Sequence, residues 1–158
     1  MGDFDKSTHE GAMISSRAIV LCVAILLSLG SAGTARAQAA GEVAAAITEY
    51  SNLYGVPESL VHSIVKRESK YNPKARHGGN WGLMQINYAT ARIMGYRGSA
   101  KGLLDVDANL KYGVKYLAGA YLVAGGNTRR ALGYYTGGYY YVAKRKGLLE
   151  ETGLKPMR

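Results

Sequence analysis

Short runs of apolar residues at helical spacing, each ended by glycine or proline, dominate residues 41–146. The first run predicts a helix over 41–54 that Gly55 ends, and the second predicts a helix that begins near Pro57 and ends by 72–73. Further helices are expected over 87–94, from Asp107 as N-cap to 124, over 127–136 and over about 139–146. Residues 73–81 hold helix breakers and no apolar period, which indicates a loop or small hairpin. We therefore expect one mainly α-helical domain, with little or no β-structure in residues 73–86.

The N-terminal segment is typical of a secretory signal peptide. Arg17 precedes an apolar run over 18–29, and Ala35-Arg36-Ala37 follows in the small-x-small pattern of a cleavage site. The run is shorter than the roughly 20 residues that a membrane-spanning helix needs, although an uncleaved N-terminal anchor stays an alternative. We predict a signal peptide over residues 1–37, with the true start at Met13, and a mature domain over 38–158.

Composition argues against several kinds of catalytic and binding site in the mature domain. Cys22, the only cysteine, lies within the apolar run. Cleavage after Ala37 would leave a mature domain without cysteine, and therefore without a disulfide or thiol catalysis. His62 and His77 lack the spacing of a zinc site, and no glycine-rich phosphate loop is present, so neither a metal nor a cofactor is expected. The net charge of +9 favours anionic polymers, although it could serve solubility alone, and export argues against nucleic acid.

Glu68 is the most informative side chain. It follows Ile64 by four residues and Val61 by seven, which places it on the apolar face of the second predicted helix. A carboxyl beside the core is costly to ionise, so we expect it to keep its proton near neutral pH and to suit general acid catalysis. The alternative is a buried glutamate that an arginine or the backbone satisfies.

Four motifs occur in a specific order along the chain. Glu68-Ser69 is followed by the GLMQI stretch at 82–86, by Asp107-Ala-Asn-Leu with Gly113 and Tyr116-Leu117, and by ALGYYTGG at 131–138. This series resembles the lytic transglycosylases of family 1, the soluble lytic transglycosylase type, over about residues 55–140. The resemblance implies a lysozyme-like (goose-type) single helical domain.

The resemblance also implies the site residues. Glu68 matches the catalytic carboxylate and Ser69 a residue that shapes the site, whereas residues 82–86, with Gly82, Met84 and Gln85, would line the sugar groove. Tyr135 matches a tyrosine near the carboxyl. Thr136 stands where the family usually has asparagine, and Tyr134 where it has alanine, so the role of the third motif in activity stays open.

Aromatic side chains supply further groove candidates. The chain holds 13 tyrosines and one tryptophan, and flat rings pack well against sugars. Tyr88 and the tyrosines at 139–141 are the candidates nearest the motifs, although most tyrosines are expected to be core or surface filler. Trp81 is either a lid or a core anchor.

The absence of a convincing second carboxylate favours a single-acid mechanism, because ordinary glycoside hydrolysis uses two. The resemblance then implies non-hydrolytic cleavage of the MurNAc-GlcNAc β-1,4 bond to a 1,6-anhydromuramic end, with Glu68 as acid and then base. Alternatives are a lysozyme-type hydrolase of the same bond and a non-catalytic peptidoglycan-binding or assembly protein. We expect a periplasmic monomer that acts on peptidoglycan glycan strands, and small relatives of this kind often serve envelope-spanning secretion or motility machines. Endo versus exo cleavage and peptide-stem preference stay open.

Overall fold

The computed structural model describes the backbone of residues 16–154 and the side chains from residue 33 onward, except residue 36. The chain divides into two units, residues 1–39 and residues 40–158. Met13, the predicted start, lies outside the described residues, and the predicted signal peptide over 1–37 lies partly outside them. Among the described residues, no helix combines the length and the hydropathy that crossing a bilayer requires.

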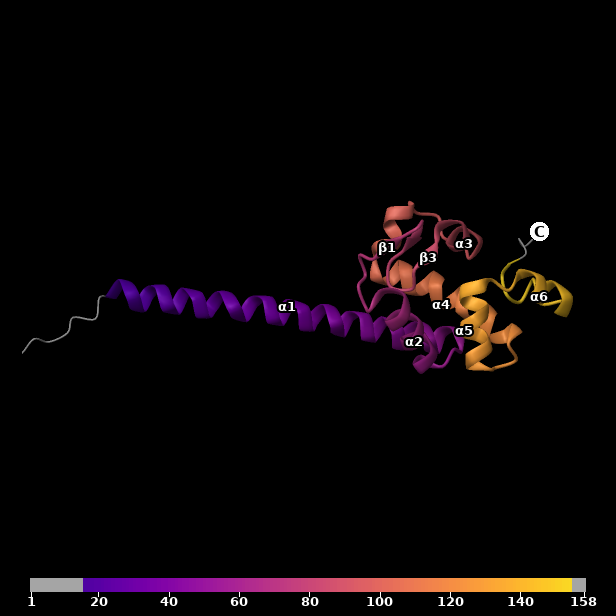
Figure 1. Cartoon of the computed structure of the whole chain (residues 1–158), viewed down its shortest axis with the longest axis horizontal. Helices are drawn as coiled ribbons and strands as arrows, with labels where there is room; N and C mark the ends of the chain where they lie inside the picture. The colour runs from indigo at the N-terminus through magenta and orange to yellow at the C-terminus, as the bar shows by residue number, and fades with distance from the viewer. Residues whose placement is uncertain (1–15, 155–158) are drawn as a thin grey trace, which may run out of the picture. The chain divides into compact units, whose positions relative to one another are not determined.

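Helices dominate the described chain, with one small sheet (Figure 1). The elements in chain order are α1 (Ser16–Tyr54), α2 (Glu58–Ser69), β1 (Arg76–His77), β2 (Asn80–Trp81), β3 (Ile86–Asn87), α3 (Tyr88–Ile93), the 3-10 helix η1 (Ala100–Leu104), α4 (Val106–Val123), α5 (Thr128–Gly137) and α6 (Tyr140–Lys146). The predicted helices after residue 40 are all present, and the fold is mainly α and lysozyme-like, as expected. Pro57, near which the second helix was expected to begin, occupies the N-cap position of α2 without a side-chain cap hydrogen bond.

The predicted loop or hairpin is a three-stranded antiparallel sheet of two-residue strands in the order β1-β2-β3. Trp81 of β2 pairs with Arg76 on one side and with Ile86 on the other. Asn87 ends the sheet and caps α3, because its side-chain oxygen accepts a hydrogen bond from the Ala89 N–H at 2.9 Å. The sheet therefore leads directly into α3, with no loop between β3 and the helix.

The predicted cap of α4 is wrong by two residues. Asp105, not Asp107, is the N-cap, since its carboxylate accepts from the Ala108 N–H at 3.0 Å. Asp107 lies in the first turn, where the Tyr50 hydroxyl of α1 donates to it. Local sequence makes Asp105 and Asp107 equally suitable as caps, but the tertiary hydrogen bond from Tyr50 engages Asp107. Near the end of α4, Leu122 is 46% exposed, so the last turn of this helix does not bury all of its apolar side chains.

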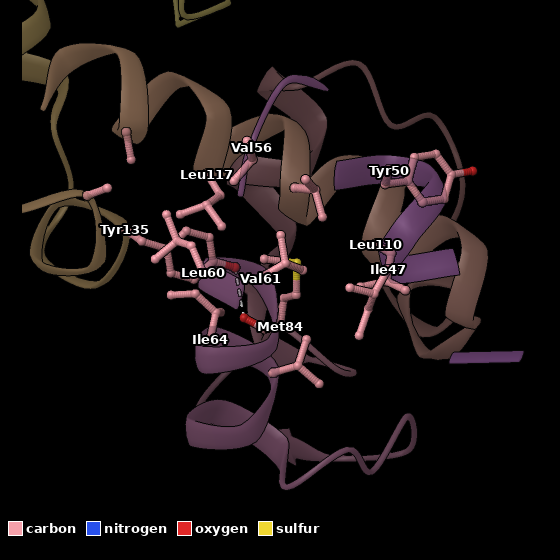
Figure 2. Close-up of a cluster of buried hydrophobic side chains, with 14 of the residues drawn as sticks. Ile47, Tyr50, Val56, Leu60, Val61, Ile64, Met84, Leu110, Leu117 and Tyr135 are labelled. Atoms are coloured by element: carbon pink, nitrogen blue, oxygen red, sulfur yellow. Dashed lines mark hydrogen bonds between the residues drawn. The ribbon is translucent and has the colours of Figure 1, made fainter. Parts of the chain in front are cut away.

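Two hydrophobic clusters share α4. The larger packs the C-terminal part of α1, with α2, α4, α5 and α6, around fully buried side chains such as Ile64, Met84 and Leu117 (Figure 2). The smaller joins the sheet, α3 and η1 through Ile86, Ala91, Tyr96 and Leu103. Different side chains of α4 pack into the two clusters. Leu110, Val114 and Leu117 belong to the larger cluster, whereas Ala108 and Tyr112 pack against the smaller one.

Candidate active site

A groove of about 320 Å³ lies where segments from the two clusters meet. It draws its walls from the end of α2, from β2 and β3, from α3 and α4, and from the end of α5. The lining residues are Glu68, Asn80, Gln85, Ile86, Asn87, Thr90, Tyr116, Tyr135, Thr136, Gly137 and Gly138. Glu68 is the one carboxylate among these lining residues within the described chain.

Glu68 occupies the last turn of α2, where its side chain is 22% exposed. The guanidinium of the preceding Arg67 donates two hydrogen bonds to the same carboxylate oxygen, Oε1, from Nε at 3.1 Å and from Nη2 at 3.0 Å. Within residues 16–154, no hydrogen bond reaches the other oxygen, Oε2. One oxygen of the pair is therefore fixed and the other is available to a ligand.

The ion pair corrects the expectation of a dry side chain, because Glu68 is 22% exposed and is paired with an arginine that is 45% exposed. The arginine-satisfied glutamate that the sequence left as an alternative is thus present. It lies in the wall of a groove, however, and not in a closed core.

Tyr135 fixes the end of α5 to the GLMQI stretch. Its ring is buried in the larger cluster, and its hydroxyl donates to the Met84 carbonyl at 2.8 Å, the dashed line in Figure 2. Burial raises the pKa of the Tyr135 hydroxyl, and the nearby negative charge of Glu68 raises it further. The side chain is therefore close to Glu68, as the resemblance implied, but its proton is committed to the backbone.

The GLMQI stretch divides between groove and core. Gln85 lines the groove in a left-handed conformation, φ 46°, and its side-chain nitrogen donates to the carbonyls of Ala75 and Gly82 at 3.1 and 2.9 Å. Met84 is fully buried, and Gly82 is buried at φ 67°. The structure therefore brings Gln85 to the groove but not Met84 or Gly82, whose roles are to pack and to turn the chain.

Two other predicted contacts lie outside the groove lining. The Ser69 hydroxyl donates to the Val65 carbonyl of its own helix at 3.1 Å. The Tyr88 hydroxyl donates to the Gly98 carbonyl at 3.2 Å, and its ring packs edge-on against Tyr96. Both side chains support the fold next to the site, because their polar atoms are used within the protein.

The remaining aromatic candidates divide between the core and the surface. Tyr139 is 1% exposed and donates to the Tyr116 carbonyl, so it belongs to the core, whereas Tyr140 and Tyr141 are exposed on α6. Trp81 is half-buried against the smaller cluster, and the Arg76 guanidinium lies 3.9 Å from its ring centre, an arrangement that stabilises the sheet.

Sequence reasoning missed part of the polar wall. Asn80 and Thr90 line the groove, and Asn87 does so in addition to its predicted capping role. Asn80 pairs directly with Asn87 across β2 and β3, and residues opposite each other share one face of a sheet. A predicted hairpin register would have found that pair. Thr136 also lines the groove, with its hydroxyl within 3.2 Å of the Leu132 and Gly133 carbonyls of its own helix.

Among the described residues, the groove lining holds neither a second acid nor a cluster of metal ligands. Asp105 and Asp107 are engaged at the start of α4 and do not line the groove. In the part of the chain that the structure describes, no three His, Cys, Asp or Glu side chains cluster as a metal site would require. The groove thus offers one carboxylate, amide and hydroxyl groups, and one buried tyrosine.

Comparison with known proteins places this geometry in context. A family model described as the transglycosylase SLT domain matches residues 45–154. Among solved structures, the chain is similar to the 70 kDa soluble lytic transglycosylase SLT70 from Escherichia coli, with a TM-score of 0.58 and 27% sequence identity. The alignment covers 68% of this chain and 18% of that protein, so the chain spans only a small part of that relative.

Proposed function

Because this chain belongs to the family of transglycosylase SLT domains, we propose that it is a lytic transglycosylase that acts on peptidoglycan. The family and the mainly α, lysozyme-like fold were both predicted from the sequence and are confirmed. The observation that carries the proposal is the position of Glu68, the one carboxylate among the described lining residues of a groove whose other lining residues are uncharged.

We propose that Glu68 acts twice in the reaction. Oε2, the oxygen without a hydrogen bond, carries the proton and donates it to the glycosidic oxygen between MurNAc and GlcNAc. The ionised carboxylate then removes the proton of the muramic 6-hydroxyl, whose oxygen bonds to C1. The leaving sugar takes the first proton and the enzyme regains the second, so no water is consumed and a 1,6-anhydromuramic end forms.

Arg67 suits the second step of this sequence. Its two hydrogen bonds hold Oε1 and stabilise the carboxylate that forms when Oε2 has lost its proton. Arg67 is 45% exposed, so the pair is partly screened by water until substrate covers it.

Gln85, Asn80 and Thr136 are the proposed glycan contacts. Because the amide nitrogen of Gln85 is engaged with two carbonyls, its oxygen is the group left to accept from a sugar hydroxyl or N-acetyl N–H. Met84, Gly82, Ser69 and Tyr88 hold the groove in shape instead.

Purified sacculi test the proposal. The chain should release 1,6-anhydromuramic ends, identified by mass spectrometry, and Glu68→Gln should lower the rate by at least about a thousandfold, since the proton donor is lost. Glu58→Gln is the matched control, because Glu58 lies in the same helix and is exposed. Reducing muramic ends would identify a lysozyme-type hydrolase. Glycan affinity without lysis in either form would identify a non-catalytic binder.

Export through cleavage after Ala37 and a periplasmic location are part of the proposal. N-terminal sequencing of the mature protein tests the cleavage site, and N-terminal sequencing of the precursor tests the start at Met13. Monomeric state and association with an envelope-spanning machine stay predictions.

A further inference from the structure

Two tyrosines of α6 differ from the tyrosines that build the core. Tyr140 is 46% exposed and Tyr141 is 74% exposed, whereas the adjacent Tyr139 is 1% exposed. Their ring centres lie 5.4 Å apart, with the ring planes at 85°. Two exposed rings at right angles form a corner that contributes little to the hydrophobic core. Large exposed aromatic side chains cost solvation free energy, so a ligand that covers them is favoured.

Two cations lie on the same helix faces as these rings. Lys144 and Arg145 follow Tyr140 and Tyr141 by four residues each, which makes each pair neighbours on the helix surface. Both cations are exposed, and neither has an interaction partner among the described residues. Lys146, by contrast, donates to the Val123 carbonyl at 2.9 Å and so helps to anchor α6. The charges of Lys144 and Arg145 are therefore not used to hold the fold.

The patch follows the groove directly along the chain. Gly137 and Gly138 line the groove, and α6 begins at Tyr140. Because consecutive Cα atoms are about 3.8 Å apart, the Tyr140 Cα lies within about 8 Å of the Gly138 Cα. A polymer longer than the groove that leaves it past Gly138 would meet this helix.

We propose that Tyr140, Tyr141, Lys144 and Arg145 form an auxiliary binding surface, the α6 patch, for an acidic glycan strand. The ligand is the continuation of the peptidoglycan strand held in the groove, so the inference rests on the proposed function. Sugar rings pack on the exposed tyrosine faces, and the carboxylates of the peptide stems pair with the ammonium and guanidinium groups. The patch would hold the enzyme on a polymeric wall without taking part in bond cleavage.

Binding to purified sacculi in a Glu68→Gln background tests the α6 patch without turnover. Tyr140→Ser with Tyr141→Ser, and separately Lys144→Gln with Arg145→Gln, should each weaken cosedimentation about tenfold or more, as loss of an anchoring cluster does. The matched control is Lys111→Gln with Arg129→Gln, which removes two exposed cations from other helices. Tyr140→Phe with Tyr141→Phe keeps the rings and should retain affinity. Thermal unfolding confirms that each variant is folded.

Several outcomes would overturn the α6 patch. Unchanged binding of both patch variants would do so, as would an equal loss in the control pair, which would indicate attraction by net charge alone. So would variants that lose affinity for phosphatidylglycerol vesicles but not for sacculi, because the surface would then be a membrane contact. Cleavage by the wild type with no effect of the patch variants refutes the patch alone. Patch-dependent binding without any cleavage refutes the proposed function alone.

Discussion

Replacing Asn109 with alanine should destabilise the protein more than any other single hydrogen-bonding change described above. The side chain is 1% exposed and joins α4 to two other backbone segments, residues 81–84 and Leu103. Its oxygen accepts from the Met84 N–H at 2.8 Å, and its nitrogen donates to the Trp81 carbonyl at 2.8 Å and to the Leu103 carbonyl at 2.7 Å. Alanine would leave one N–H and two carbonyls without partners, each at about 1–3 kcal/mol, so we expect a loss of at least about 3 kcal/mol.

Thermal unfolding followed by circular dichroism measures this loss. For a domain of this size, a loss of at least about 3 kcal/mol lowers Tm by at least about 10 °C. Asn127→Ala is the matched control, because it removes one exposed N-cap bond, to the Arg130 N–H at 2.9 Å, and should cost only about 1 kcal/mol. Asn109→Asp keeps the size of the side chain but sets oxygen against two carbonyl oxygens, so it should also destabilise strongly. If both Asn109 variants lost less than about 1 kcal/mol, the reasoning from unsatisfied backbone groups would be refuted.

Other predictions concern tyrosines and glycines. Tyr135→Phe should cost about 1 kcal/mol in chemical denaturation, because the Met84 carbonyl loses its donor. Burial raises the pKa of Tyr135 and Tyr139 in the folded state. Their contribution to stability should therefore be complete below pH 10 and fall as the pH rises above 10, because these tyrosines ionise first in the unfolded chain. A pH-independent Tm between pH 9 and 11.5 would contradict this. Gly82→Ala should destabilise by several kcal/mol, since φ is 67° and a Cβ would come within 2.3 Å of the Asn109 side chain. Gly133→Ala, in α5 with open space around it, should instead raise stability by about 0.5–1 kcal/mol in the same denaturation assay.

The helical part of the fold could be predicted because its signals are local. Asn87 and Asn127 cap helices through hydrogen bonds within three residues, and Gly55 ends α1 with a positive φ. The cap of α4 could not be decided locally, since Asp105 and Asp107 are both suitable. The Tyr50 hydroxyl decides it from far along the chain.

The site was predictable at Glu68 and less so around it. Helical spacing places Glu68 beside the core at the end of α2, but nothing in spacing predicts its ion pair with Arg67, because adjacent helical residues do not usually face each other. In the GLMQI stretch, the left-handed backbone at Gln85 changes which side chains face the groove. The sequence motif therefore predicts the segment, whereas the burial of Met84 and the groove position of Gln85 depend on this backbone turn.

The sharing of α4 between two hydrophobic clusters limits how the groove could adapt to different ligands. A hinge between lobes would have to bend a continuous helix of 18 residues whose sides are packed into both. The two sides of the groove are thus expected to move together as one rigid body. Tolerance for varied ligands would then have to come from rotation of lining side chains such as Gln85, and not from opening and closing of the whole groove.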